Sequence, residues 1–192
     1  HSVLLAHIGQ ATSVTLYRKL SYHPVYAFDT VGMIAEVPMV LVGKKDFAPK
    51  DARELISFVR SNRDKVTYGN GGTGSASHLC GLLLMSSMKA EMTTVPYRGS
   101  GPAMQDLLGG RIDLLCDQTT TTVGPIRNAQ VKPYAVTMRE RVASVSELPT
   151  LAESGLPGFS MTFFLGLLGP AGIPRDIVTR LNAETVKALG RK

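Results

Sequence analysis

The sequence contains no tryptophan, and aromatic residues make up only 6% of it. Proteins that bind single-stranded nucleic acid stack the bases on aromatic side chains, and such side chains are scarce here. The formal net charge is +6, but adjacent basic residues occur only as pairs, such as Arg18-Lys19 and Lys44-Lys45. Dispersed charge is typical of a solvated surface that attracts anions mildly. We therefore expect no nucleic-acid partner.

Long apolar runs are also missing. Glycine, proline or charge interrupts each candidate before the roughly 18–20 residues that a membrane-spanning helix needs. The first residues lack a basic segment followed by a cleavage site, so no signal peptide is visible. An apolar stretch follows position 1 closely, and a predicted helix runs almost to the last residue. We therefore expect an internal fragment of a longer protein.

Only two cysteines are present, Cys80 and Cys116, and their spacing is not that of a metal site. Each lies beside leucine, as a buried small apolar side chain would. A disulfide is the open alternative, but the sequence cannot place the two sulfur atoms within reach. We interpret both cysteines as buried small apolar side chains, and their redox state stays open. The four histidines show no metal-like spacing either, so no metal and no cofactor is predicted.

Short apolar runs alternate with segments of helical periodicity. Strands are predicted at residues 3–8, 37–43, 66–70, 93–97, 112–116, 133–138 and 162–168. Helices are predicted at residues 10–20, 51–62, 75–88, 103–108, 148–154 and 174–189. The last helix is expected to bury Ile177, Val178, Leu181, Ala188 and Leu189. This alternation predicts an α/β fold with mainly parallel sheets, in which ligands bind beyond the carboxyl ends of the strands.

A glycine-rich loop between a predicted strand and a predicted helix is the most informative segment. It lies within residues 66–79 and combines four glycines with the hydroxyl groups of Thr73, Ser75 and Ser77. The free N–H groups of a first helical turn carry partial positive charge, so the loop could bind a carboxylate or a phosphate. The alternative is a tight connection in which Ser75 only caps the helix. The loop lacks the Lys-Ser/Thr of a P-loop and matches the dinucleotide fingerprint only loosely.

Two further side chains lie beyond predicted strands, where ligand-binding residues gather. Arg98 could pair with a carboxylate, although a surface arginine is the commoner case. Asp117 could hold a ligand ammonium group or a bridging water, and its alternative role is to form the turn before Thr119.

Catalysis has little support in the sequence. The segment around Ser75, Ser77 and His78 does not form a Gly-x-Ser-x-Gly nucleophile elbow, and His78 is more typical of a packing histidine. No pair of carboxylates has an evident acid–base arrangement.

Two long blocks of sequence resemble the Bug family, the extracytoplasmic receptors of tripartite tricarboxylate transporters. They are YGNGGTGSASHL at residues 68–79 and VPYRGSGPAMQDLLGGRID at residues 95–113. Shorter similar stretches occur in the same order at residues 5–9, 16–20, 132–137, 141, 148–157 and 166–174. Together the blocks span nearly the whole chain, which is far more specific than one glycine loop.

The resemblance implies a type II periplasmic binding protein-like fold, with two α/β lobes, a ligand cleft and hinge-crossing strands at residues 37–43 and 160–169. Lobe 1 is then residues 1–43 plus 160–192, incomplete at both termini, and lobe 2 is residues 44–159. The ligand is expected to be a dicarboxylate, a citrate-like acid, an acidic amino acid or an aromatic acid. Its implied contacts are Ile8, Gly9 and Thr12 in a loop of lobe 1, and Gly72, Thr73, Gly74, Ser75, Ser77, Arg98 and Asp117 in lobe 2.

We therefore expect a periplasmic, non-catalytic and monomeric receptor that works with the membrane subunits of a transporter. A ligand-sensing module of the same fold is the first alternative, and a genomic neighbourhood without transporter subunits would favour it. An enzyme on an α/β scaffold is the distant alternative, and turnover of a candidate acid would reveal it.

Overall fold

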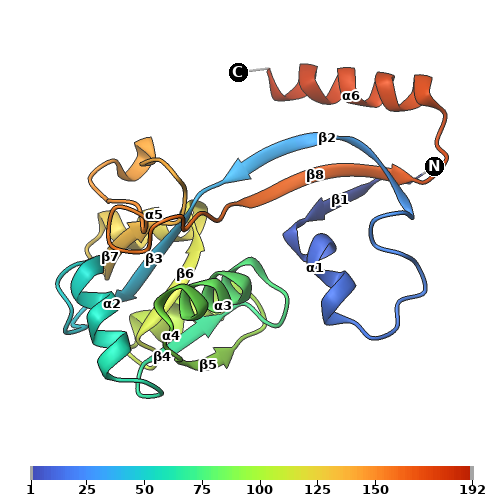
Figure 1. The fold of residues 1–192 in the computed structure, drawn as a ribbon. Helices are drawn as coiled ribbons and strands as arrows, with labels where there is room; N and C mark the ends of the chain where they lie inside the picture. Colours follow the sequence, from blue (N-terminus) through green and yellow to red (C-terminus); the bar gives the residue numbers. More distant parts are fainter. Residues whose placement is uncertain (1, 191–192) are drawn as a thin grey trace. The chain divides into compact units, whose positions relative to one another are not determined.

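The computed structural model describes residues 2–190, which form two compact units (Figure 1). Unit 1 takes in the described residues up to Glu36 and those from Phe163 onward, and unit 2 is Val37–Thr162. The units divide after residues 36 and 162, whereas the expected lobes divide after residues 43 and 159. Whether the units act as the lobes of a receptor stays a prediction.

Unit 2 is built on a mixed sheet whose strands, in order, are β5-β4-β6-β3-β7. Their bounds are β3 Met39–Lys44, β4 Thr67–Asn70, β5 Thr93–Pro96, β6 Leu114–Gln118 and β7 Val131–Val136. Strand β4 pairs in parallel with β5 and β6, whereas β3 pairs antiparallel with β6 and β7. The prediction of mainly parallel sheets is therefore right for β4 with β5 and β6, and wrong for β3 and β7. It is also wrong for unit 1, where β1 (Leu4–His7) and β8 (Phe163–Pro170) pair antiparallel.

The helices of unit 2 are α2 Ala52–Ser61, α3 Ala76–Met88, α4 Ser100–Leu108 and α5 Thr119–Arg127, with a 3₁₀ turn η1 at Ala143–Val145. The structure confirms the helix predicted at residues 51–62. Asp51 caps it by accepting a hydrogen bond from the Glu54 N–H at 2.9 Å. The periodic apolar residues Ala52, Leu55, Ile56 and Val59 are all buried.

The helix predicted at residues 148–154 is wrong. Thr150 forms an isolated bridge with Val136, and the Leu151 N–H donates to the Val136 carbonyl, so the segment begins as an extension of the β7 edge. Turns follow it, and the Glu153 carboxylate accepts the Thr150 N–H at 2.7 Å. Backbone groups of Pro149 and Leu151 are hydrogen-bonded to Val136 of β7, so they are not available for a helix.

The core of unit 2 lies between the sheet and its helices. Its apolar cluster includes Val40, Leu107, Ile112, Leu115 and Val136, each at most 2% exposed. Burial of each such side chain stabilises the unit by about 1.5–3 kcal/mol. This packing fixes the strand ends from which the candidate site is built.

Unit 1 contains a smaller sheet and two helices. The sheet order is β1-β8-β2, with β1 at Leu4–His7, β8 at Phe163–Pro170 and β2 at Phe28–Val37. Helix α1 is Ile8–Leu16 and α6 is Arg175–Leu189. Strand β2 was not predicted. Helix α1 overlaps the helix predicted at residues 10–20, but it begins before residue 10 and ends before residue 20.

The buried stripe predicted for α6 is wrong. The helix forms, but Ile177 is 38% exposed and Leu189 is 52% exposed, and no residue of α6 is buried. Its attachment to the sheet is polar, because the Asn182 side-chain amide donates to the Val31 carbonyl at 2.8 Å. No helix within residues 2–190 is both long enough and apolar enough to cross a membrane.

Candidate functional site

Three helices of unit 2 begin at one edge of its sheet. The parallel strands β5, β4 and β6 lead into α4, α3 and α5, respectively. Because parallel strands place their carboxyl ends at the same edge, the three helix starts lie along that edge. Each start carries partial positive charge from its free N–H groups. The edge is therefore suited to an anion.

The glycine-rich loop before α3 is held together by its own hydroxyl groups. The Ser75 Oγ accepts a hydrogen bond from the His78 N–H at 3.2 Å and lies 3.0 Å from the Ser77 Oγ. The Ser77 Oγ accepts the Gly71 N–H at 2.8 Å. The His78 Nδ1 accepts the Gly74 N–H at 3.2 Å, so His78 has a structural role in the loop. Ser75 therefore caps α3, which is the role that the sequence offered as the alternative to anion binding.

Backbone donors of this loop remain unused. Within residues 2–190, the N–H groups of Thr73, Ala76 and Ser77 have no hydrogen-bond acceptor. Two of these groups belong to the first turn of α3, where no intrahelical acceptor exists. Gly72 and Gly74 have φ angles of 109° and 80°, which favour glycine and set the path of the loop. The loop thus presents N–H donors, while the hydroxyls of Ser75 and Ser77 fix its shape.

The starts of α4 and α5 have no side-chain cap. Gly99 precedes α4 with a φ angle of 103°, and a Cβ added there or at Gly101 would meet no atom within 4 Å. Gln118 precedes α5, and the first N–H of that helix, from Thr119, donates to the Pro38 carbonyl at 2.9 Å. The N–H groups of Ser100 and Gly101 in α4, and of Thr120 and Thr121 in α5, have no acceptor in the described chain. These donors are available to a ligand.

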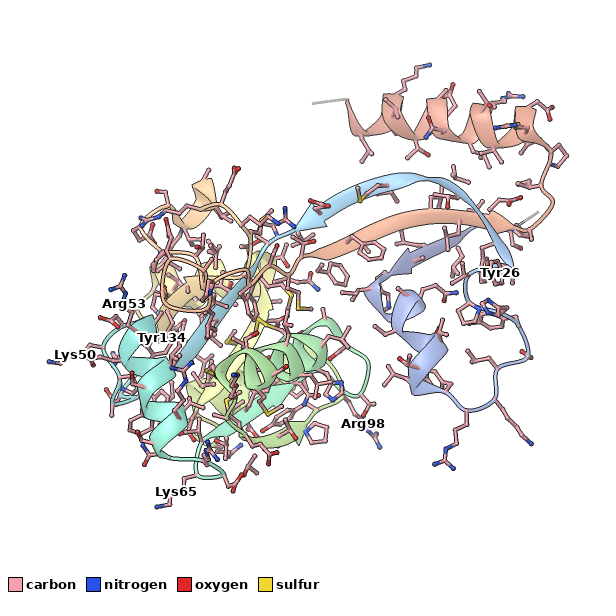
Figure 2. All side chains as sticks on the ribbon, in the orientation of Figure 1. Tyr26, Lys50, Arg53, Lys65, Arg98 and Tyr134 are labelled. Atoms are coloured by element: carbon pink, nitrogen blue, oxygen red, sulfur yellow. A yellow bond between two sulfur atoms is a disulfide. The ribbon has the colours of Figure 1, made fainter. Side chains whose placement is uncertain are left out.

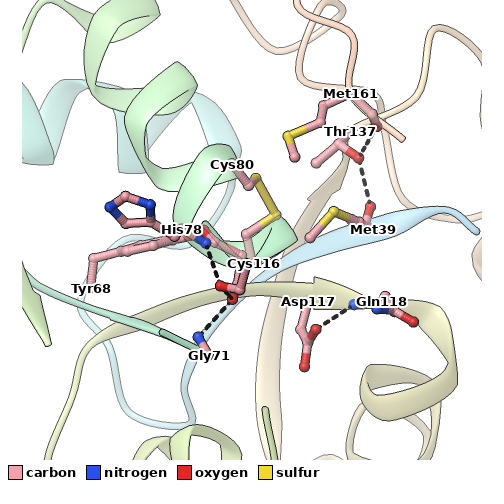
Figure 3. The surroundings of a disulfide bond; sticks show 12 residues. Met39, Tyr68, Gly71, His78, Cys80, Cys116, Asp117, Gln118, Thr137 and Met161 are labelled. Carbon is pink, nitrogen blue, oxygen red and sulfur yellow. Dashed lines mark hydrogen bonds between the residues drawn. A yellow bond between two sulfur atoms is a disulfide. The ribbon is translucent and has the colours of Figure 1, made fainter. Parts of the chain in front are cut away.

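Asp117 lies at this edge, near the end of β6, and each of its carboxylate oxygens accepts a hydrogen bond from the start of α5. The residue is only 2% exposed. One oxygen accepts the Gln118 N–H at 2.9 Å (Figure 3), and the other accepts the Thr121 hydroxyl at 2.9 Å. A negative charge next to the first turn of α5 stabilises that helix. The structure thus gives Asp117 the turn-forming role that the sequence left open.

Tyr68, in β4, forms a hydrogen bond with the first turn of α3. Its hydroxyl donates to the Ser77 carbonyl at 2.6 Å, and its ring is fully buried. Burial raises the pKa of Tyr68 well above its usual value, and the negative charge of Asp117 raises it further. Tyr68 therefore stays protonated and keeps donating this hydrogen bond.

Arg98 lies in the loop between β5 and α4. Figure 2 shows its side chain extending outward, and it forms no ion pair within the described ranges. The loop itself is fixed to the glycine loop, because the Tyr97 N–H donates to the Asn70 carbonyl at 2.8 Å and the Gly99 N–H donates to the Gly71 carbonyl at 3.2 Å. Arg98 is thus an exposed cation next to the helix starts.

The lobe 1 residues are placed differently from the expectation. Ile8, Gly9 and Thr12 belong to unit 1 and form the first turns of helix α1, so the expected loop is wrong. The His7 Nδ1 accepts the Gly9 N–H at 3.0 Å and caps the helix, and the Thr12 hydroxyl donates to the Gly9 carbonyl at 3.2 Å. An imidazole cap is uncommon, which is why the pattern placed the helix start too late.

The two cysteines form a disulfide, which is the alternative that the sequence left open (Figure 3). Cys80 lies in α3 and Cys116 lies in β6, both are fully buried, and their Cα atoms are 6.4 Å apart. The burial was predicted correctly, but the packing of α3 against β6 was not visible in the sequence. The bond joins the helix that follows the glycine loop to the strand that contains Asp117.

Sequence reasoning missed the third helix start. The run of four threonines at residues 119–122 has low helix propensity, and Pro125 lies inside the helix, so α5 gave no helical signal. It also missed Asn70, which is 1% exposed and accepts the Gly72 N–H at 2.9 Å. The position of residues 118–119 directly after a buried strand was the signal that could have identified this start. Residues 2–190 contain no cluster of His, Cys, Asp or Glu that could hold a metal ion.

Comparison with known proteins places these features in a family. The model of the tripartite tricarboxylate transporter family receptor matches residues 2–191. A protein of Agrobacterium vitis from the TAR-I ttuE-ttuC' intergenic region is 44% identical over 189 residues, covering 98% of this chain and 55% of the relative. The protein BugT of Bordetella pertussis is 28% identical, covering 95% of this chain and 56% of BugT. The chain thus spans about half the length of these relatives.

Solved structures show the same fold. The periplasmic binding protein BugD has a TM-score of 0.87 at 41% identity, covering 97% of this chain and 62% of BugD. MatC of Rhodopseudomonas palustris with bound malate has a TM-score of 0.88 at 38% identity, covering 99% of this chain and 65% of MatC. An R. palustris protein with adipate has a TM-score of 0.89 at 34% identity, covering 99% of this chain and 64% of that protein. The fold is therefore that of these periplasmic binding proteins.

Proposed function

Because the chain belongs to the tripartite tricarboxylate transporter receptor family, as its resemblance to Bug receptors predicted, we propose that it binds a small carboxylate outside the cytoplasmic membrane and presents it to transporter membrane subunits. The observation that carries the proposal is the set of three helix starts at one sheet edge, with N–H groups that have no acceptor in the described chain.

The chemistry of this edge fits a carboxylate. Each helix start contributes about 0.3–1 kcal/mol to an adjacent anion when exposed, and up to about 2 kcal/mol when partly buried. Several N–H donors can share the oxygens of one carboxylate, so no formal cation has to be buried. Arg98 and the net charge of +6 add a favourable long-range field for anions.

The proposed contacts in unit 2 are Gly72, Thr73, Gly74, Ser75 and Ser77, together with Arg98 and Asp117. Among these, we assign direct contact to the N–H donors around Thr73 and Ser77, and an indirect role to Asp117, whose carboxylate already binds the start of α5. The family resemblance adds Ile8, Gly9 and Thr12 of unit 1 as further proposed contacts.

Dicarboxylates are the first ligands to test. MatC is described with malate and another structural neighbour with adipate, and both acids carry two carboxylates. Citrate-like acids, acidic amino acids and aromatic acids complete the proposed range. A periplasmic location agrees with the Cys80–Cys116 disulfide, because disulfides persist in oxidising compartments.

A thermal-shift screen against mono-, di- and tricarboxylates tests the proposal. An acid at 100 times its Kd should stabilise the protein by about 2.7 kcal/mol. The decisive pair of variants is Ser100→Asp and Ser100→Asn at the first position of α4. Aspartate suits a helix start but places a like charge beside the ligand, whereas asparagine has nearly the same shape and no charge.

We expect the acid-induced shift to disappear in the aspartate variant and to persist in the asparagine variant. Equal shifts in both variants would place the acid elsewhere, and no shift with any acid would count against the receptor function.

A further inference from the structure

The chain enters and leaves unit 2 through two segments that meet at one residue. The boundaries of the unit fall after Glu36 and after Thr162. Thr137, directly after β7, is fully buried and contacts both segments, at Met39 on the incoming side and at Met161 on the outgoing side (Figure 3). Thr137 is not among the proposed ligand contacts.

Thr137 holds both segments with backbone and side-chain groups. Its N–H donates to the Met39 carbonyl at 3.0 Å, and its carbonyl accepts the Met161 N–H at 2.8 Å. Its hydroxyl lies 2.6 Å from the Met161 carbonyl and 3.3 Å from the Met39 carbonyl, so one proton serves two acceptors from opposite segments. The hydroxyl therefore ties together two stretches of chain that are 122 positions apart.

The incoming segment continues this link to the candidate site. Met39 pairs with Gln118 in the β3–β6 ladder, and the Pro38 carbonyl accepts the Thr119 N–H at 2.9 Å. Pro38 and Met39 thus lie between Thr137 on one side and the start of α5 on the other. A shift of this dipeptide would move the N–H groups of α5 that the proposed function assigns to the ligand.

We propose that Thr137 is a positioning residue: its hydroxyl fixes the two connecting segments of unit 2 and, through Pro38 and Met39, the start of α5 at the carboxylate site. The effect on ligand affinity rests on the proposed function, whereas the anchoring of the segments does not.

Hydrogen–deuterium exchange of the full chain tests the anchor without any ligand. Thr137→Val removes the hydroxyl and keeps the branched shape, and Thr137→Ser keeps the hydroxyl. Ser154→Ala is the matched control, because Ser154 is also buried in unit 2 but its hydroxyl donates only to Thr150 within its own turn.

In the valine variant, amide exchange at Thr119 and Met161 should be about fivefold faster, which corresponds to about 1 kcal/mol for one neutral hydrogen bond. Exchange in α2 should stay unchanged, and serine should restore slow exchange. The Thr119 amide is the discriminating probe, because Thr137 does not contact it. Unchanged exchange at Thr119 in the valine variant, or an equal acceleration there in Ser154→Ala, would overturn the proposal.

Titration with malate and adipate adds the functional measurement. If either acid binds the wild type, we expect its Kd to rise about fivefold in Thr137→Val and to recover in Thr137→Ser. Faster exchange at Thr119 with an unchanged Kd would overturn the positioning role. Faster exchange at Thr119, with none of the acids of the thermal-shift screen bound by the wild type, would support the anchor and count against the receptor function, so the two failures are distinguishable.

Discussion

Reduction of the Cys80–Cys116 disulfide is expected to lower the free energy of unfolding substantially. The bond closes a loop with a sequence separation of 36 residues. For a loop of this length, the chain-entropy relation gives about 4 kcal/mol of destabilisation at 25 °C when the cross-link is removed. That is a large fraction of the total stability of about 5–15 kcal/mol typical of a folded domain.

Urea denaturation of the oxidised and the reduced chain measures this difference directly. Far-UV circular dichroism is the suitable probe, because the sequence has no tryptophan to report by fluorescence. Unfolding in a reductant followed by refolding gives a chain with the same side chains and no cross-link, so no cavity is introduced. A thiol count on the unfolded protein confirms the starting states, with none free before reduction and two after it.

Two results would refute this reasoning. Two free thiols in protein purified without reductant would show that the bond is not formed. A difference below about 1 kcal/mol between the two forms would show that the cross-link does not restrict the unfolded chain as the loop length requires.

Two other substitutions test the packing of unit 2. The Asp113 side chain, which is 14% exposed, forms an ion pair with Lys44 at 2.7 Å and accepts hydrogen bonds from Thr67. Burial alone would raise the pKa of Asp113, but the ion pair and the hydrogen bonds outweigh it and hold the pKa below its usual value. The stability that these interactions contribute is therefore present at neutral pH. It is lost as the pH falls below about 4. Asp113→Asn should therefore cost about 2 kcal/mol at pH 7 in urea denaturation, with a smaller cost at pH 2.5, and a pH-independent cost would contradict this account. Gly81→Ala should destabilise unit 2 by about 1–3 kcal/mol in thermal unfolding, because the added methyl group would overlap the ring of the buried Tyr68, and an unchanged or raised Tm would show that the ring can move away.

The elements predicted correctly are those whose signal is local. Helix α2 has a capping residue at Asp51 and a regular apolar stripe, and the sequence placed it almost to the residue. The glycine loop before α3 was recognised because glycine and serine have conformational and capping roles that depend little on the rest of the fold.

The features that were missed depend on distant parts of the chain. Helix α5 forms from a threonine run because Asp117 and the Pro38 carbonyl hold its start, and neither partner can be identified from periodicity. The disulfide depends on the packing of α3 against β6. Helix α6 has an apolar stripe in its sequence, but burial of that stripe requires a neighbouring surface, which periodicity does not supply.

The most direct test of the central claim is an amide NMR titration of the protein with malate and with adipate. If the helix starts bind the carboxylate, the resonances of Thr73, Ala76, Ser77, Ser100 and Thr120 should shift together and saturate with one Kd, while those of α2 stay in place. Saturable shifts confined to other parts of unit 2, with these five resonances unchanged, would contradict the site and the account built on it.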